Sequence, residues 1–145
     1  MFDELNKYKQ KDHFFFRRQD ELSTICNAPD NKSGIYIVYA LQRGKIELVY
    51  IGSSGELQED GSMVIRKAGL SSIKDQIVNG HQFGEIPGRT LWPSQMELEN
   101  IEVLDVYWYI THNDEYIDCP GTLENKLLKK YLAIYGKLPK WNKEL

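Results

Sequence analysis

Two strand-like runs separated by a short polar turn constrain the fold of this chain more than any other feature. Gly34 to Leu41 reads GIYIVYAL, and Ile46 to Ser53 reads IELVYIGS. Both runs are rich in β-branched and aromatic residues, which favour strands, and the turn between them contains a glycine. We therefore expect an antiparallel β-hairpin that carries Tyr36 on one strand and Tyr50 on the other.

The rest of the chain adds one strand and two clear helical patterns. Ile101 to Thr111 is expected to be a third, well-buried strand, because apolar side chains recur at every second position. Helices are expected at about Leu70–Asn79 and Leu123–Tyr135, each of which is followed by a glycine. Pro87–Pro93 is expected to be a loop. These elements predict an α+β fold with a small three-stranded antiparallel sheet flanked by helices.

The length of 145 residues allows one domain. Residues 34–145 are expected to form that domain, and the charged residues 1–33 an N-terminal extension that packs on it. A composition of 41% hydrophobic and 27% charged residues is that of a soluble globular protein. No apolar run reaches the roughly 18 residues of a membrane span, and the N-terminus lacks a secretory signal, so we expect a cytoplasmic protein. Cys26 and Cys119 lack metal-site spacing and are expected to be reduced thiols.

The charge distribution leaves the choice of partner open. A formal net charge of −3 argues mildly against a nucleic-acid partner, because DNA-binding proteins usually present a basic surface. From Pro120 to Leu145, however, six lysines and two glutamates give +4, which leaves −7 for the remainder of the chain. This end of the molecule can face an anion, or its lysines can simply form the solvated side of a helix.

Glu124 is the most informative acidic residue. Leu127, Leu128 and Tyr131 follow it at i+3, i+4 and i+7, so they form an apolar stripe on the same helix face and the carboxylate should point inward. In the first turn of a helix, free backbone N–H groups would stabilise such a carboxylate as an anion that can hold a cation. The alternative is a helix-start glutamate that bonds to its own backbone.

In this order and spacing, Gly34-Ile35-Tyr36, Tyr50-Ile51-Gly52 and Glu124 resemble the GIY-YIG nuclease family. The resemblance extends from about Ser33 to Asn142 and implies a metal-dependent endonuclease. It assigns one Mg²⁺ or Mn²⁺ to Glu124, and the holding or deprotonation of the attacking water to Tyr50, or to Tyr36 acting with it. A phenol with a pKa near about 10 needs cationic or metal neighbours to act as a base, and otherwise only positions the water. Asn142 resembles the late asparagine that helps to arrange the family's site.

The family also uses an arginine on the helix after the second tyrosine, and here the chain departs from the pattern. Gln76 occupies the expected register. Arg66 from the preceding segment or Lys74 one turn away can supply the missing cation, or the chain is a degenerate form with little turnover. Four further residues are candidates for contacts with nucleic acid, namely Lys67, Lys74, Gln76 and His81.

The resemblance implies double-stranded DNA as partner, with homodimerisation as a route to both strands, and no membrane. Two other classes of function remain open at this stage. The first is a catalytically weak nucleic-acid-binding module, and the second is a structural or protein-interaction domain in which Glu124 is a helix cap and the tyrosines are core residues.

Overall fold

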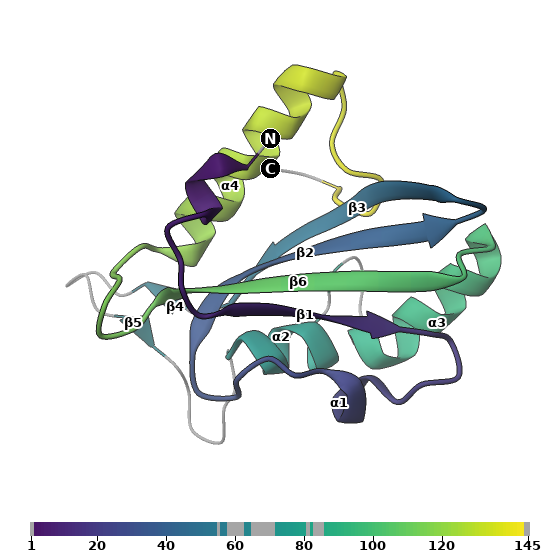
Figure 1. Cartoon of the computed structure of the whole chain (residues 1–145), viewed down its shortest axis with the longest axis horizontal. Coiled ribbons are helices and arrows are strands. Elements are labelled where there is room, and N and C mark those ends of the chain that lie inside the picture. Colours follow the sequence, from purple (N-terminus) through teal and green to yellow (C-terminus); the bar gives the residue numbers. More distant parts are fainter. Residues whose placement is uncertain are drawn as a thin grey trace.

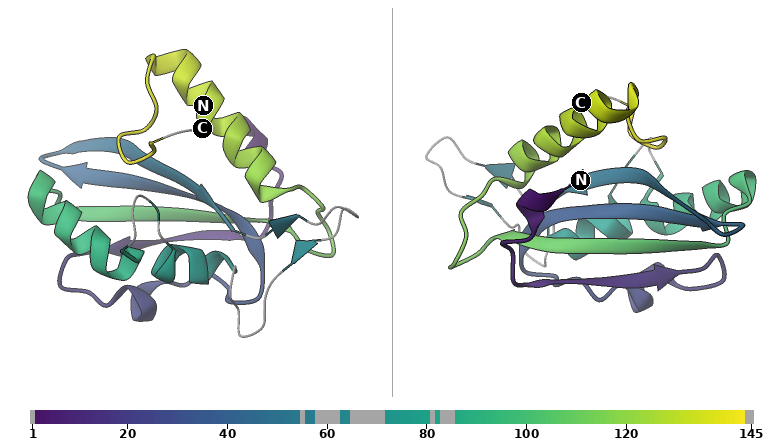
Figure 2. Two further views of the ribbon diagram at one scale, coloured as in Figure 1. Left: turned by 180° about the vertical axis from the view of Figure 1, so that it is seen from behind. Right: turned by 45° about the horizontal axis from the view of Figure 1, so that its top comes forward.

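The computed structural model describes residues 2–54, 56–57, 63–64, 72–80, 82 and 86–143. Its elements are η1 (Asp3–Leu5), β1 (Lys11–Phe16), α1 (Leu22–Ile25), β2 (Ser33–Gln42), β3 (Lys45–Ser53), β4 (Glu56–Leu57), β5 (Met63–Val64), α2 (Ile73–Asn79), α3 (Gly88–Glu99), β6 (Val103–His112) and α4 (Pro120–Tyr135). Figure 1 shows α4 on one face of the main sheet and α1, α2 and α3 on the other. Both chain ends lie on the α4 side, as Figure 2 also shows.

The expected hairpin forms from β2 and β3. Its two central turn residues, Arg43 and Gly44, have φ angles of 50° and 76°. Positive φ at both positions is the requirement of a two-residue turn whose twist matches that of the strands. The register pairs Tyr36 with Gly52 and Val38 with Tyr50, and one irregularity follows Val38. The hairpin therefore carries both tyrosines on the same face of the sheet.

The main sheet has four strands, in the order β1-β6-β2-β3, so the expected three-stranded sheet is wrong. The added strand is β1, which pairs with β6 from Lys11↔Tyr109 to Phe16↔Leu104. Within β1, Phe14 and Phe16 are 6% and 0% exposed, whereas Phe15 between them is 44% exposed. This alternation has the period of a strand, but charged neighbours make the run look irregular in the sequence.

The helix α3 corrects a second expectation, because Pro87 to Pro93 is not a loop. Gly88–Glu99 is helical, with Pro87 at its N-cap position and Pro93 inside it. An interior proline costs about 3 kcal/mol. Trp92 and Met96 are fully buried, and burial of each contributes about 1.5–3 kcal/mol. Packing of these two side chains therefore offsets the proline.

Two hydrophobic layers enclose the sheet. Tyr36, Val38 and Val106 pack with α1, α2 and α3 in one layer. Ile35, Ile37 and Leu127 belong to the other layer, between the sheet and α4. Neighbouring residues of β2 thus serve opposite layers, as strand geometry requires. Among the described residues, no helix combines the length and apolar character needed to cross a membrane.

Candidate active site

The two tyrosines of the hairpin lie next to each other. Their ring centroids are 5.8 Å apart, and the ring planes are tilted by 38°. The side chain of Tyr36 is buried, with 1% of its surface exposed, while that of Tyr50 is half-buried. The hairpin therefore presents one phenol close to solvent and a second phenol behind it.

Both motif glycines allow close approach within the protein itself. A Cβ atom on Gly52 would lie 2.4 Å from Cζ of Tyr36, so the phenol of Tyr36 lies directly over this glycine. A Cβ atom on Gly34 would lie 1.9 Å from the main-chain oxygen of Tyr109. A missing side chain in a strand can let a ligand or another part of the chain approach closely. In the structure, each glycine makes room for a group of the chain itself.

Gln82 is a site residue that the sequence analysis did not find. Its Nε2 donates to the Tyr36 hydroxyl at 3.3 Å and to the main-chain oxygens of Gln76 and Ile77 at 2.8 and 3.2 Å. Its main-chain oxygen lies 3.5 Å from the Tyr50 hydroxyl. Position just after a helix end is the only signal in the sequence, and it does not distinguish Gln82 from any other loop residue.

Burial and local charge keep both phenols protonated at neutral pH. The pKa of Tyr36 is raised well above its usual value of 10.0, first by burial and also by Tyr50 and Glu124, against a lowering by the Gln82 hydrogen bond. The pKa of Tyr50 is also raised, by burial and then by Glu124, and the hydrogen bond from Tyr36 opposes this shift. Neither phenol has the lowered pKa that a general base would need.

Glu124 lies near the tyrosines but reaches them from the other face of the sheet. Its side chain is half-buried, and it is hydrogen-bonded to Ser53 at the end of β3. Burial raises the pKa of the carboxyl group, and the Ser53 hydrogen bond opposes that shift. Glu124 also raises the pKa of both Tyr36 and Tyr50, so the three ionisable groups share one electrostatic environment.

The position of Glu124 within α4 differs from the expected one. The helix begins at Pro120 rather than Leu123, so Glu124 is its fifth residue and the first turn contains no acid. Free N–H groups of the first turn therefore do not stabilise the carboxylate. The inward direction of this helix face is confirmed, because Leu127, Leu128 and Tyr131 are buried.

Asn142 contacts the backbone of the motif itself. The Ile51 N–H donates to Oδ1 of Asn142 at 2.9 Å, and Nδ2 of Asn142 donates to the Ile51 oxygen at 3.0 Å. The N–H of Trp141 donates to the Val49 oxygen at 2.8 Å. Since β3 is an edge strand of the sheet, these bonds satisfy its outer edge. Asn142 therefore fixes the strand between Tyr50 and Gly52.

The expected cations are not beside the tyrosines in the part of the chain that the structure describes. Lys74 in α2 lies beside the segment that follows α1, where its N–H donates to the Pro29 oxygen and its charge lowers the pKa of Cys26. No lysine or arginine of the described residues is among the groups that shift the pKa of Tyr36, Tyr50 or Glu124. Gln76, in the last turn of α2, connects to Tyr36 through Gln82. Three further candidates, Arg66, Lys67 and His81, lie outside the described residues.

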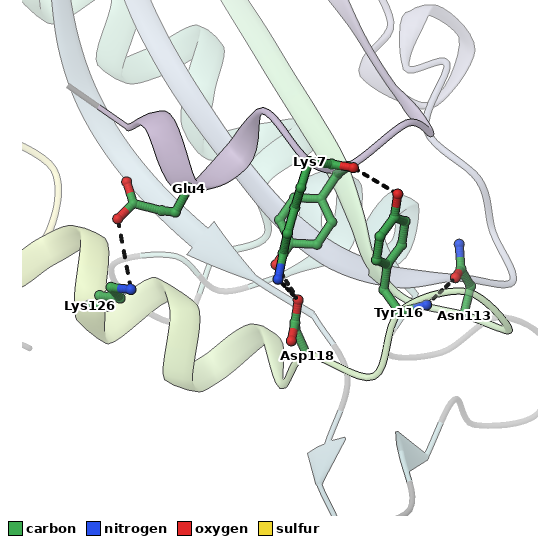
Figure 3. A network of polar contacts seen from close by, with 7 residues as sticks. Glu4, Lys7, Asn113, Tyr116, Asp118 and Lys126 are labelled. Atoms are coloured by element: carbon green, nitrogen blue, oxygen red, sulfur yellow. Dashed lines mark hydrogen bonds and ion pairs between the residues drawn. The ribbon is translucent and has the colours of Figure 1, made fainter.

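The basic C-terminal end is partly neutralised by acidic residues from elsewhere. Figure 3 shows Lys126 beside Glu4 of η1, with 4.0 Å between Nζ and Oε2. Lys130 lies 3.4 Å from the same carboxylate, and Lys140 lies 2.5 Å from Glu99. The three remaining lysines of this end are exposed and make no ion pair with a described residue, namely Lys129, Lys137 and Lys143.

A hollow of about 500 Å³ lies elsewhere, between η1, α4 and the face of the hairpin that α4 covers. Ile37, Tyr39 and Tyr109 line it, while Tyr36, Tyr50 and Glu124 do not. This hollow is therefore separate from the site of the motif residues.

No group of three or more histidine, cysteine or acidic residues among those described could hold a metal ion. A Mg²⁺ ion bound by one carboxylate, waters and a substrate phosphate does not need such a group. The half-buried Glu124 carboxylate, which has one side-chain hydrogen bond from Ser53, retains acceptor capacity for a hard cation.

A scan against protein-family models and searches of curated proteins and of solved structures found no match to this chain. The resemblance to the GIY-YIG family therefore depends on the motif residues and on their arrangement.

Proposed function

We propose that this chain is a metal-dependent endonuclease that hydrolyses DNA phosphodiester bonds through a GIY-YIG-type active site. The observation that supports this most is the convergence of three groups from distant parts of the sequence. Tyr36 and Tyr50 lie side by side on the hairpin, and Glu124 of α4 raises the pKa of both phenols. Asn142 fixes the strand that carries Tyr50, which matches the family's use of a late asparagine.

Glu124 would hold one Mg²⁺ or Mn²⁺ ion. The ion, when bound, neutralises charge on the scissile phosphate and assists the leaving oxygen. A cation beside Glu124 also removes the destabilisation of a half-buried carboxylate, since burial is what raises its pKa. The donor set thus suits a hard divalent cation.

Tyr50 positions the attacking water or the phosphate through its neutral hydroxyl. This role follows from the raised pKa values of both tyrosines, which favour positioning over deprotonation. Tyr36 is buried behind Tyr50 and supports it. The charge that develops on phosphorus needs a cation, for which Arg66 stays the candidate.

Double-stranded DNA is the substrate that we propose, and a cytoplasmic location and a homodimer belong to the same proposal. Lys129, Lys137 and Lys143 are exposed basic groups available for phosphate contacts. Because their number is small, we expect binding to fall only moderately with salt, by a log–log slope near about −3.

A plasmid-nicking assay with Mg²⁺ or Mn²⁺ tests this function. Glu124→Gln and Tyr50→Phe should each lower the cleavage rate by about 100-fold or more, because they remove the metal ligand and the positioning hydroxyl. Tyr135→Phe is the matched control, since Tyr135 is exposed at the far end of α4 and should keep the wild-type rate.

Wild-type protein that does not cleave DNA, but binds it with a steep salt dependence, would favour the catalytically weak binding module. Protein that neither cleaves nor binds DNA would favour the structural or protein-interaction domain. Cleavage that is indifferent to both Glu124→Gln and Tyr50→Phe would place the activity at another site or in a contaminant.

A further inference from the structure

The side-chain amide of Gln82 has only one orientation that satisfies its neighbours. Its nitrogen lies 2.8 Å from the main-chain oxygen of Gln76 and 3.2 Å from that of Ile77. Carbonyl oxygens can only accept hydrogen bonds, so Nε2 and not Oε1 must face this end of α2. The last carbonyl groups of a helix lack N–H partners within the helix; Gln82 supplies a donor to the Ile77 oxygen and a second donor to the Gln76 oxygen, which also accepts from the Gly80 N–H.

The orientation of Gln82 determines the direction of the next hydrogen bonds. Nε2 also donates to the Tyr36 hydroxyl at 3.3 Å, so the Tyr36 oxygen acts as an acceptor toward Gln82. The ring of Tyr36 lies beside that of Tyr50, with 5.8 Å between the two centroids. Tyr50 then directs its own hydrogen toward the main-chain oxygen of Gln82, at 3.5 Å. Gln82 therefore contacts the hydroxyls of both tyrosines.

The hydrogen bonds that involve Gln82 differ in strength. The distance from Nε2 to the Gln76 oxygen is that of a good hydrogen bond, whereas 3.5 Å between Tyr50 and Gln82 is at the limit for a hydroxyl donor. The Tyr36 hydroxyl accepts a hydrogen bond from Gln82, and the residue is buried. The half-buried Tyr50 hydroxyl is the one that can exchange its weak internal partner for a ligand oxygen.

We propose that Gln82 is a positioning residue of the active site, which holds the hydroxyls of Tyr36 and Tyr50 in place and leaves that of Tyr50 as the one that contacts the phosphate or the attacking water. The part that concerns substrate rests on the proposed nuclease function. The part that concerns the three side chains does not, and it can be tested without DNA.

The test replaces Gln82 by methionine, which keeps the length of the side chain and removes its donors. The readout without DNA is the ¹³Cζ resonance of labelled Tyr36 and Tyr50 at fixed pH, assigned with the two Tyr→Phe variants. Gln82→Met should shift both resonances and lower the melting temperature by roughly 2–6 °C. Gln10→Met is the matched control, because Gln10 is exposed and precedes β1, and it should change neither.

The readout with DNA is the nicking rate under the same conditions. Gln82→Met should lower kcat by about tenfold and leave KM within about twofold, because the phenol is displaced and the phosphate-binding lysines are not. A lower melting temperature with both tyrosine resonances unchanged would overturn the proposal and leave Gln82 as a helix cap only. Inactive wild-type protein would refute the nuclease function, yet the resonances would still decide the role of Gln82.

If Gln82→Met does not fold, Tyr36→Phe provides the second measurement, since it removes only one hydroxyl. The side-chain NH₂ resonances of Gln82 and the Tyr50 ¹³Cζ resonance should both shift in this variant. Unchanged Gln82 and Tyr50 resonances in Tyr36→Phe would overturn the proposal.

Discussion

Single residues at this site act mainly by making room and by directing hydrogen bonds. Gly52 lets the Tyr36 ring lie against the strand, and Gln82 fixes the hydroxyl of that ring. The tyrosine pair could be predicted from the sequence, because strand alternation places Tyr36 and Tyr50 on one face once the hairpin is assumed. Gln82 could not, because its role depends on a contact with a residue 46 positions away in the chain.

Gly52→Ala should destabilise the protein by about 1–3 kcal/mol, because the added Cβ would lie 2.4 Å from the Tyr36 ring and the ring must move. Urea unfolding followed by circular dichroism measures the change. Gly121→Ala is the control, since a Cβ there meets nothing within 4 Å and the residue lies in α4. A Gly52→Ala protein as stable as the wild type would show that the ring has room to shift.

At the scale of elements, local signals located the hairpin and α4, and they failed for α3. The hairpin and α4 carry turn residues, a terminal glycine and clear periodicity, which are all properties of neighbouring residues. In α3 the two prolines suggest a loop, and only burial of Trp92 and Met96 against the sheet reverses that preference. Tertiary packing of this kind is not visible in a local pattern.

The last turn of α2 is where the family arginine would stand, and Gln76→Arg tests that register. Its main-chain oxygen is two hydrogen bonds away from the Tyr36 hydroxyl, by way of Gln82. A guanidinium at this position should raise the DNA-nicking rate by about tenfold or more, because it adds charge stabilisation in the transition state. Lys74→Arg, which leaves a cation on the Cys26 side of the helix, should not change the rate. A higher nicking rate for Lys74→Arg would instead assign the arginine register to position 74.

The C-terminal segment connects the edge of β3 to α3 through Glu99, and the stability that this connection contributes should depend on pH. Trp141 and Lys140 both bond to the Glu99 carboxylate, at 2.7 and 2.5 Å. Burial alone would raise the pKa of Glu99, but bonds from Lys140, Gln95 and Trp141 outweigh it and lower the pKa below the ordinary 4.5. A carboxyl group with a lowered folded-state pKa stabilises the protein above its unfolded-state pKa, and this stabilisation is lost as the pH falls.

The stability difference between the wild type and Glu99→Gln should therefore be largest at neutral pH, at roughly 1–3 kcal/mol, and should shrink below about pH 4.5. Urea unfolding at several pH values measures it. Glu97→Gln is the matched control on the same helix, because Glu97 is exposed and makes no ion pair with a described residue. A difference that stays constant from neutral to acidic pH would exclude Glu99 as its source.

At the scale of the whole molecule, the candidate site lies where the two hydrophobic layers meet. Tyr36 and Tyr50 belong to the layer of α1, α2 and α3, whereas α4, which carries Glu124, covers the opposite face. The groups can converge because β3 is an edge strand, with α4 on one side and Gln82 on the other. In a central strand, the sheet itself would separate side chains that approach from its two faces.

The N-terminal residues belong to the same body, since β1 forms the opposite edge of the sheet. Deletion of residues 1–33 should therefore abolish folding rather than release a folded domain, because it removes the buried Phe14 and Phe16 and exposes the edge of β6 that pairs with β1. A matched pair of point variants separates packing from chain length. Phe16→Ala should cost about 3–5 kcal/mol and Phe15→Ala less than about 1 kcal/mol, since the first ring is 0% and the second 44% exposed. Thermal unfolding of both variants, and a two-dimensional NMR spectrum of the deletion, measure these effects. If the deletion variant keeps dispersed resonances, three strands suffice for folding. Equal losses of stability in Phe16→Ala and Phe15→Ala would mean that β1 does not keep this register in solution.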